Sequence, residues 1–200
     1  MTVLSQDRHA HIAFMNQRSL SWKQTDVMHV ADYKRFQVLD GAGLRCSLYV
    51  SFCPFNCKGC YNKVAQKRSF GVPYNREIED LIISDLSLPH VAGLTLCGGE
   101  PMLSAKHILP LVQRIREEVP NATIWSYTGY LYETLLKCTD ERYLLLKMID
   151  VLVDGQFIEE LVDHSHVNPF AGSTNQRVIN VSYSLAKKKV VLVNQYNEAG

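Results

Sequence analysis

Residues 44–60 read LRCSLYVSFCPFNCKGC, and this stretch indicates both a fold and a chemistry. Apolar side chains occupy every second position from Leu44 to Phe52, which predicts a half-buried β-strand. Three cysteines follow within eight residues, so they lie in a loop at the carboxyl end of this strand. Because parallel α/β sheets bind their ligands at that end of the strands, the sequence predicts a site there.

The spacing of Cys53, Cys57 and Cys60, with three residues and then two between them, suits an iron–sulfur cluster. A [4Fe–4S] cube takes four cysteine thiolates, so three from one loop leave one iron open to bind another molecule. A zinc site usually shows two separated pairs of ligands, and here it would need His90 or His107 as its fourth ligand. Three unrelated core thiols are the other alternative, but the spacing and its context favour the cluster.

Composition and length indicate one globular domain, which we expect to span residues 30–200. The 200 residues are 46% hydrophobic and 20% charged, with a formal net charge of +1. This charge gives no reason to expect nucleic acid or a membrane as a partner, and no run of 18 apolar residues predicts a membrane span. Residues 1–29 are polar and irregular, so we expect a mobile extension without the apolar segment of a secretory signal.

The other three cysteines have structural explanations. Cys46 and Cys97 fall in apolar strand patterns, where buried free thiols are common, and Cys138 lies near a helix end. A chain of this length with an ordinary core does not need disulfides. The six cysteines therefore fit a reducing, cytoplasmic setting.

Strand and helix patterns alternate after the cysteine loop. Strands are predicted at residues 93–97, 122–127, 151–153 and 178–181, and helices at residues 74–86, 108–119, 130–136 and 142–148. This alternation predicts an α/β fold with a parallel sheet and crossover helices. A complete eight-fold barrel needs about 250 residues, so we expect an incomplete, open parallel β/α barrel. Its strand ends would bring the cysteine loop to one rim with Gly98-Gly99-Glu100, Thr128-Gly129 and Asp154-Gly155.

Gly98, Gly99 and Glu100 form the second candidate site. An open iron needs a ligand with an amine and a carboxylate, and the methionine end of S-adenosylmethionine offers both. Two glycines allow close approach of the backbone, whose carbonyls can accept hydrogen bonds from an ammonium, and Glu100 adds an acidic acceptor. By themselves two glycines after a strand indicate only a turn, but beside the cysteine loop they favour ligand binding. A side chain at Gly99 is therefore expected to weaken cofactor binding while leaving the cluster in place.

Three further features leave alternatives open. Tyr61, directly after the last cysteine of the loop, could stack on an adenine or could pack the loop. Asp154 could bind a ribose hydroxyl or a cation, or could be a solvated residue of the turn before Gly155. His164 and His166 are more typical of a loop than of a metal site.

Together these motifs resemble the radical S-adenosylmethionine superfamily, and most closely its anaerobic ribonucleoside-triphosphate reductase activating proteins. The matching stretches lie between residues 36 and 181, at residues 40–45, 59–63, 98–101, 125–130, 151–155 and 172–176. Many superfamily members carry an aromatic residue just before the third cysteine, where it touches the adenine. Here that position is Gly59, as in the reductase activators, which favours this subfamily and makes Tyr61 the candidate for the adenine contact.

The resemblance implies a set of cofactors, partners and site residues. A [4Fe–4S] cluster would be held by Cys53, Cys57 and Cys60, and S-adenosylmethionine would be bound by Gly59, Cys60, Tyr61, Gly98, Gly99 and Glu100. A flavodoxin-like donor would deliver one electron, which breaks the S–C5′ bond and gives a 5′-deoxyadenosyl radical. That radical would take a hydrogen atom from the Cα of one glycine in the large subunit of the anaerobic reductase. No side chain needs to act as a general acid or base, so no further catalytic residue is expected.

Three other functions remain as alternatives. The chain could activate another glycyl-radical enzyme such as pyruvate formate-lyase, or act on a small molecule as the 7-carboxy-7-deazaguanine synthases do. Its short length and residues 172–176 favour the reductase activators. A zinc-stabilised module or a simple electron carrier is the non-catalytic alternative, but an electron carrier has no use for Gly98-Gly99-Glu100.

Overall fold

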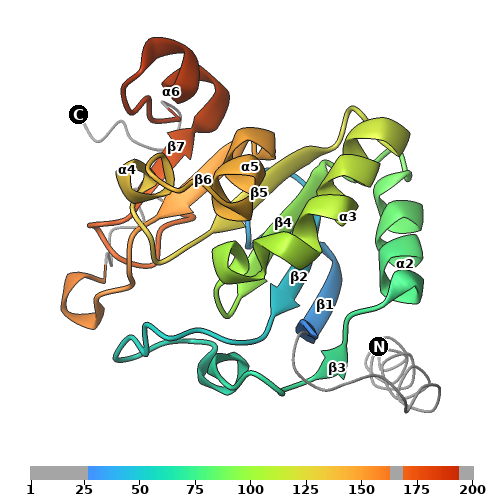
Figure 1. Ribbon diagram of the computed structural model, residues 1–200, viewed down its shortest axis with the longest axis horizontal. Coiled ribbons are helices and arrows are strands. Elements are labelled where there is room, and N and C mark those ends of the chain that lie inside the picture. Colours follow the sequence, from blue (N-terminus) through green and yellow to red (C-terminus); the bar gives the residue numbers. More distant parts are fainter. Residues whose placement is uncertain (1–26, 163–168, 194–200) are drawn as a thin grey trace.

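The structure, a computed structural model, describes residues 27–162 and 169–193 (Figure 1). These residues form a seven-stranded sheet with helices packed against it. Most of the expected polar extension lies outside the described residues, as do His164 and His166. The first strand, β1, spans His29–Gln37, and Met28 just before it is already buried.

The described strands form an open sheet in the order β3-β1-β2-β4-β5-β6-β7. The central strands are parallel, namely β2 (Arg45–Val50), β4 (Gly93–Gly98), β5 (Thr123–Tyr127) and β6 (Val151–Asp154). The flanking strands pair antiparallel, namely β1, β3 (Val72–Pro73) and β7 (Arg177–Asn180). The expected open α/β sheet is confirmed, and its central strands pair in parallel as expected, whereas the strands at both edges pair antiparallel. The chain after β6 turns back at the same end of the sheet, which places Arg177 opposite Asp154.

Helices lie at the four predicted places, and a further helix at Val181–Lys187 was not predicted. They are α2 (Arg76–Leu86), α3 (Ala105–Glu118), α4 (Tyr132–Leu135), α5 (Glu141–Met148) and α6 (Val181–Lys187), with the 3₁₀ turns η1 (Lys63–Gln66), η2 (Pro101–Ser104) and η3 (Glu159–Leu161). Helix α3 packs against both α2 and α5 on one face of the sheet (Figure 1). Asn75 begins α2 by accepting a hydrogen bond from Ile78 N. Within residues 27–162 and 169–193, none of the helices combines the length and apolarity that crossing a bilayer requires.

The two faces of the parallel strands carry different side chains. Alternate residues of each strand contribute to the main apolar core on the helix side, among them Cys46, Leu48, Leu94, Leu96 and Ile124. The residues between them are mostly polar or aromatic and face the other side of the sheet. A smaller apolar cluster there contains Trp125, Val153 and Val178. The second face therefore has the polar groups that a ligand site requires.

The strand predicted within residues 44–52 is fully buried, so the expectation that it is half-buried is wrong. All six residues of β2 are buried, and Arg45 is only 1% exposed. The Arg45 guanidinium donates hydrogen bonds to Thr95 Oγ1 (2.9 Å) and to Thr123 O (2.8 Å), and it lies over the ring of Trp125. Burial lowers the pKa of Arg45 to about 10. The polar face of β2 is covered because Trp125 and the backbone at Ala42 pack over it.

Candidate active site

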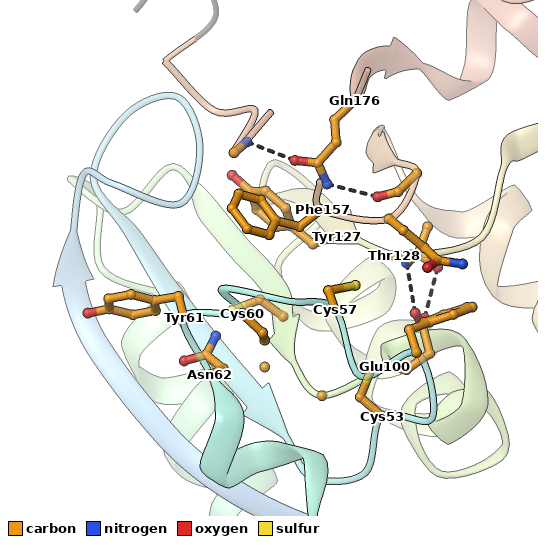
Figure 2. A pocket seen from close by; sticks show the side chains of 18 of the residues that line it. Cys53, Cys57, Cys60, Tyr61, Asn62, Glu100, Tyr127, Thr128, Phe157 and Gln176 are labelled. Carbon is orange, nitrogen blue, oxygen red and sulfur yellow. Dashed lines mark hydrogen bonds between the residues drawn. The ribbon is translucent and has the colours of Figure 1, made fainter. Parts of the chain in front are cut away.

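A cavity of about 380 Å³ opens where the four parallel strands end (Figure 2). Its wall contains every residue predicted for the site, namely Cys53, Cys57, Gly59, Cys60, Tyr61, Gly98, Gly99 and Glu100. Thr128, Gly129 and Gly155, from the ends of β5 and β6, also line the cavity. The prediction that the loops at the strand ends meet at one rim is therefore confirmed.

The cysteine loop connects β2 to η1, and backbone hydrogen bonds hold its shape. Phe52 N donates to Ala65 O (2.7 Å), and Cys60 N donates to Cys57 O (3.2 Å). Gly59 has a φ of 70°, in the left-handed region that glycine adopts without strain. All six cysteines lie in the described part of the chain and are free thiols, and the three of this loop are partly exposed toward the cavity.

Three cysteine sulfurs on one cavity wall are a suitable donor set for an iron–sulfur cluster. Burial raises the pKa of the Cys53 thiol to about 11, and burial also raises the pKa of Cys57. Metal ligands must be thiolates, so loading the site with metal displaces these protons. Assembly of a cluster is therefore expected to become easier as the pH rises.

A single zinc ion fits this arrangement less well. Within the described residues, no three Cys, His, Asp or Glu side chains are grouped closely enough to hold one metal ion. His90 packs against Phe36, with ring centroids 5.8 Å apart, and the described residues that line the cavity include neither His90 nor His107. Zinc holds all of its ligands about 2.0–2.3 Å from one centre, whereas a [4Fe–4S] cube places each thiolate on a different iron. The spread of the sulfurs favours the cluster.

Gly98 and Gly99 line the cavity, and both are also required for packing. A Cβ on Gly98 would lie 2.6 Å from Val50 O, and a Cβ on Gly99 would lie 2.4 Å from Phe52 O. Both oxygens belong to the end of β2 and to the start of the cysteine loop. Backbone hydrogen bonds from Gly99 N to Val50 O (2.6 Å) and from Glu100 N to Phe52 O (2.8 Å) hold the two segments together. The two glycines thus allow the loop after β4 to lie close to the start of the cysteine loop.

Glu100 joins the loop after β4 to the loop after β5 (Figure 2). It is 1% exposed, and Oε1 accepts hydrogen bonds from Met102 N (3.0 Å) and Thr128 Oγ1 (2.8 Å). Oε2 accepts from Gly129 N (2.8 Å). Burial raises the pKa of Glu100 to about 7, although these hydrogen bonds oppose the shift. Glu100 therefore positions the residues around the cavity, a role that the Gly-Gly-Glu motif alone did not indicate.

Tyr61 is 88% exposed at the edge of the cavity, so the alternative that it packs the loop is wrong (Figure 2). Its contact with an adenine stays a prediction. Because Tyr61 makes little contact with the rest of the fold, its ring is available to a ligand or to a partner.

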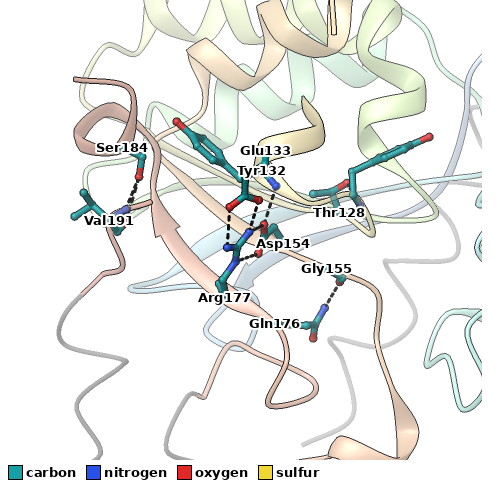
Figure 3. A network of polar contacts seen from close by, with 10 residues as sticks. Thr128, Tyr132, Glu133, Asp154, Gly155, Gln176, Arg177, Ser184 and Val191 are labelled. Carbon is teal, nitrogen blue, oxygen red and sulfur yellow. Dashed lines mark hydrogen bonds and ion pairs between the residues drawn. The ribbon is translucent and has the colours of Figure 1, made fainter. Parts of the chain in front are cut away.

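Both alternatives for Asp154 are wrong, because its side chain is completely buried and paired (Figure 3). Asp154 accepts hydrogen bonds from Tyr132 N (2.8 Å) and Arg177 Nε (2.9 Å). Arg177 also forms an ion pair with Glu133 (2.8 Å). Asp154 therefore holds β6, β7 and the start of α4 together, and it does not line the cavity among the described residues.

Gln176 and Phe157 complete the cavity wall, and neither was proposed as a binding residue. Gln176 Oε1 accepts hydrogen bonds from Gly172 N (2.8 Å) and Ser173 N (3.2 Å), while its Nε2 donates to Gly155 O (2.8 Å). The only signal in the sequence was the resemblance of residues 172–176 to the reductase activators. That match did not say that the segment folds back onto the loop after β6.

Comparison with known proteins agrees with this geometry. A sequence profile of the family described as 4Fe-4S single cluster domain matches residues 39–179, most of the chain. A protein of Vibrio cholerae named anaerobic ribonucleoside-triphosphate reductase-activating protein is 44% identical over 153 residues, which cover 74% of this chain and 96% of that protein. This chain belongs to the reductase-activating protein family. Members with the same name from Escherichia coli K12 and Enterobacteria phage T4 are 39% and 31% identical, over 76% and 70% of this chain and 97% and 86% of theirs.

Membership of the reductase-activating protein family supports a 4Fe–4S cluster in the cavity. The matched residues 39–179 contain the whole cysteine loop, Gly98-Gly99-Glu100 and Gln176. The region that defines the family is therefore also the region that builds the cavity.

Proposed function

We propose that this chain generates a glycyl radical on the large subunit of an anaerobic ribonucleoside-triphosphate reductase. The observation that carries this proposal is the convergence of Cys53, Cys57 and Cys60 on one cavity in a chain of the reductase-activating family. These three side chains would hold a [4Fe–4S] cluster and leave its fourth iron open. The open sheet would be an incomplete barrel of the radical S-adenosylmethionine type.

S-adenosylmethionine would bind beside the cluster, in the same cavity. The carbonyls of Gly98 and Gly99, which line the cavity beside the buried carboxyl of Glu100, would accept hydrogen bonds from its ammonium. Tyr61, exposed at the rim, would contact the adenine. Gly59 and Cys60 complete the wall between these groups.

The chain contributes positioning and exclusion of water. When bound, the cluster and S-adenosylmethionine would together supply a 5′-deoxyadenosyl radical that takes a hydrogen atom from one glycine of the reductase. Glu100 keeps Thr128 and Gly129 in place around the cavity, and Phe157 covers the side next to the cysteine loop. Aromatic side chains in the wall, among them Phe55, Phe157 and Phe170, would help to keep water away from a reactive species.

We further infer that the chain works in the cytoplasm and receives its electron from a flavodoxin-like protein. The free thiols and the oxygen-sensitive cluster that they would hold suit a reducing compartment. We expect neither nucleic acid nor a membrane among its partners, because the formal net charge is only +1.

Electron paramagnetic resonance tests the function directly. Reduced, reconstituted protein with S-adenosylmethionine and the reductase is expected to give a glycyl radical, and a reductase whose target glycine is alanine is expected to give none. Cys57→Ala should be inactive, whereas Cys138→Ala, which changes a thiol outside the cavity, should be active. A radical formed only on another glycyl-radical enzyme, or turnover of a small purine instead, would overturn the proposal.

A further inference from the structure

The segment 155–161 lies directly against the cysteine loop. Phe157 and Cys57 line the same cavity wall, and the backbone N–H of Phe157 is near enough to the Cys57 sulfur to oppose the rise that burial causes in the pKa of that thiol. Lys58 Nζ lies 3.0 Å from a carboxylate oxygen of Glu159 and 3.0 Å from one of Glu160. A Cβ on Gly59 would lie 2.5 Å from Glu159 Oε1, so the Glu159 side chain lies directly against the loop. The segment therefore covers the side of the loop that carries Cys57.

A clasp formed by Ser173, Asn175 and Gln176 holds this segment in place. Asn175 Nδ2 donates to Gln156 O (2.8 Å). Gln176 Nε2 donates to Gly155 O (2.8 Å; Figures 2 and 3). Ser173 is completely buried, and its Oγ accepts a hydrogen bond from Ile158 N (3.2 Å) while donating to Asn175 Oδ1 (2.7 Å). The clasp thus fixes the backbone on both sides of Phe157.

These hydrogen bonds hold the segment better than the ion pairs of Lys58 do. The Lys58 side chain is 75% exposed, and those of Glu159 and Glu160 are 44% and 65% exposed. Exposed ion pairs contribute little because solvent and salt screen them. The hydrogen bonds of the clasp to Ile158 N and Gly155 O are partly buried, and the one to Gln156 O is exposed. The position of the Phe157 N–H therefore depends mainly on the clasp.

We propose that Ser173, Asn175 and Gln176 are positioning residues that hold the Phe157 N–H on the Cys57 sulfur and thereby raise the reduction potential of the cluster. This inference rests on the proposed function, in which Cys57 is a cluster ligand. A reduced cluster carries one more negative charge, part of which lies on the sulfurs. An N–H donor that points at a ligating sulfur stabilises that charge, so it makes the cluster easier to reduce.

The test compares Ser173→Ala and Gln176→Met with wild type and with Ser87→Ala. Both clasp variants are uncharged, so they do not alter the potential through a new charge near the cluster. Ser87→Ala also removes a partly buried hydrogen bond from a side chain to the backbone, to Ile83 O (2.8 Å), but at the end of α2. Each protein is reconstituted anaerobically, its iron is measured, and its midpoint potential is found by a redox titration followed by electron paramagnetic resonance.

We expect a more negative midpoint potential in both clasp variants and the wild-type potential in Ser87→Ala. Hydrogen exchange should become faster at the amides of residues 156–158 in the clasp variants alone. A clasp variant with a full cluster and an unchanged potential would overturn the inference but leave the proposed function intact. Absence of a cluster in the wild type would overturn both the inference and the proposed function. Unchanged hydrogen exchange at the amides of residues 156–158 would show that the clasp does not hold the segment, and would overturn the inference alone.

Discussion

Gly99→Ala is expected to damage the cluster site through the backbone of the cysteine loop. The added Cβ would lie 2.8 Å from Phe52 C and 2.4 Å from Phe52 O, and the second distance is about 1 Å short of the 3.4 Å at which ordinary contact begins. Both are backbone atoms, so no side chain can rotate away to make room. Phe52 directly precedes Cys53, and its carbonyl accepts the hydrogen bond from Glu100 N (2.8 Å). Overpacking of this kind costs about 1–3 kcal/mol.

The measurement is iron and sulfide content after anaerobic reconstitution, together with a titration of S-adenosylmethionine binding. We expect Gly99→Ala to lower both, because a shift of about 1 Å at Phe52 would move Cys53, a proposed ligand of the cluster. Gly155→Ala provides the contrast, since its Cβ would lie no closer than 3.6 Å to other atoms and only its φ of 96° is strained. That variant should be less stable by about 1–2 kcal/mol but keep its iron. Normal iron with weaker cofactor binding in Gly99→Ala would refute the packing argument and leave ligand approach as the reason for the glycine.

Three further predictions concern stability and cluster ligation. The pKa of Glu100 is raised to about 7 in the folded protein, so its contribution to stability is complete below pH 4.5 and is lost as the pH rises through 7. Glu100→Gln should remove this pH dependence, which amounts to about 3 kcal/mol in the free energy of unfolding, measured by urea unfolding at pH 5 and pH 8. An equal change in the free energy of unfolding between these two pH values in both proteins would contradict the prediction. Asp154→Asn should cost about 3 kcal/mol in urea unfolding because it breaks the buried pair with Arg177, and a loss below about 0.5 kcal/mol would show that the pair is dispensable. Cys57→Ala should prevent assembly of the cluster and Cys138→Ala should not, as measured by iron and sulfide content. A normal cluster in Cys57→Ala, or loss of the cluster in Cys138→Ala, would exclude the ligand assignment.

The positions of the cavity residues were predictable because they follow from local patterns and sheet geometry. Apolar alternation at residues 44–52 placed the cysteine loop at a strand end, and the same applies to Gly98-Gly99-Glu100 after β4. Parallel neighbouring strands then bring these loops together without any knowledge of side-chain contacts. The iron–sulfur chemistry followed from the cysteine spacing.

The roles of individual polar residues were not predictable, because they depend on partners far away in the sequence. Asp154 resembles a solvated turn residue until the antiparallel return of β7 places Arg177 opposite it. Glu100 resembles a ligand-binding acid until its hydrogen bonds to Thr128 and Gly129 are known. Arg45 looks like a solvent-facing residue of a strand, but Trp125 and the backbone at Ala42 cover it. Local periodicity predicts which face of a strand a residue lies on, but it does not predict what packs over that face.

Hydrogen transfer from the reductase can be followed with an isotope. A reductase large subunit prepared with Cα-deuterated glycine would be mixed with the reduced, reconstituted protein and S-adenosylmethionine, and the 5′-deoxyadenosine would be analysed by mass spectrometry. We predict one deuterium in the 5′-deoxyadenosine that forms with the glycyl radical, and no deuterium when the target glycine is alanine. 5′-Deoxyadenosine that contains no deuterium, although a glycyl radical has formed, would contradict direct abstraction by this protein.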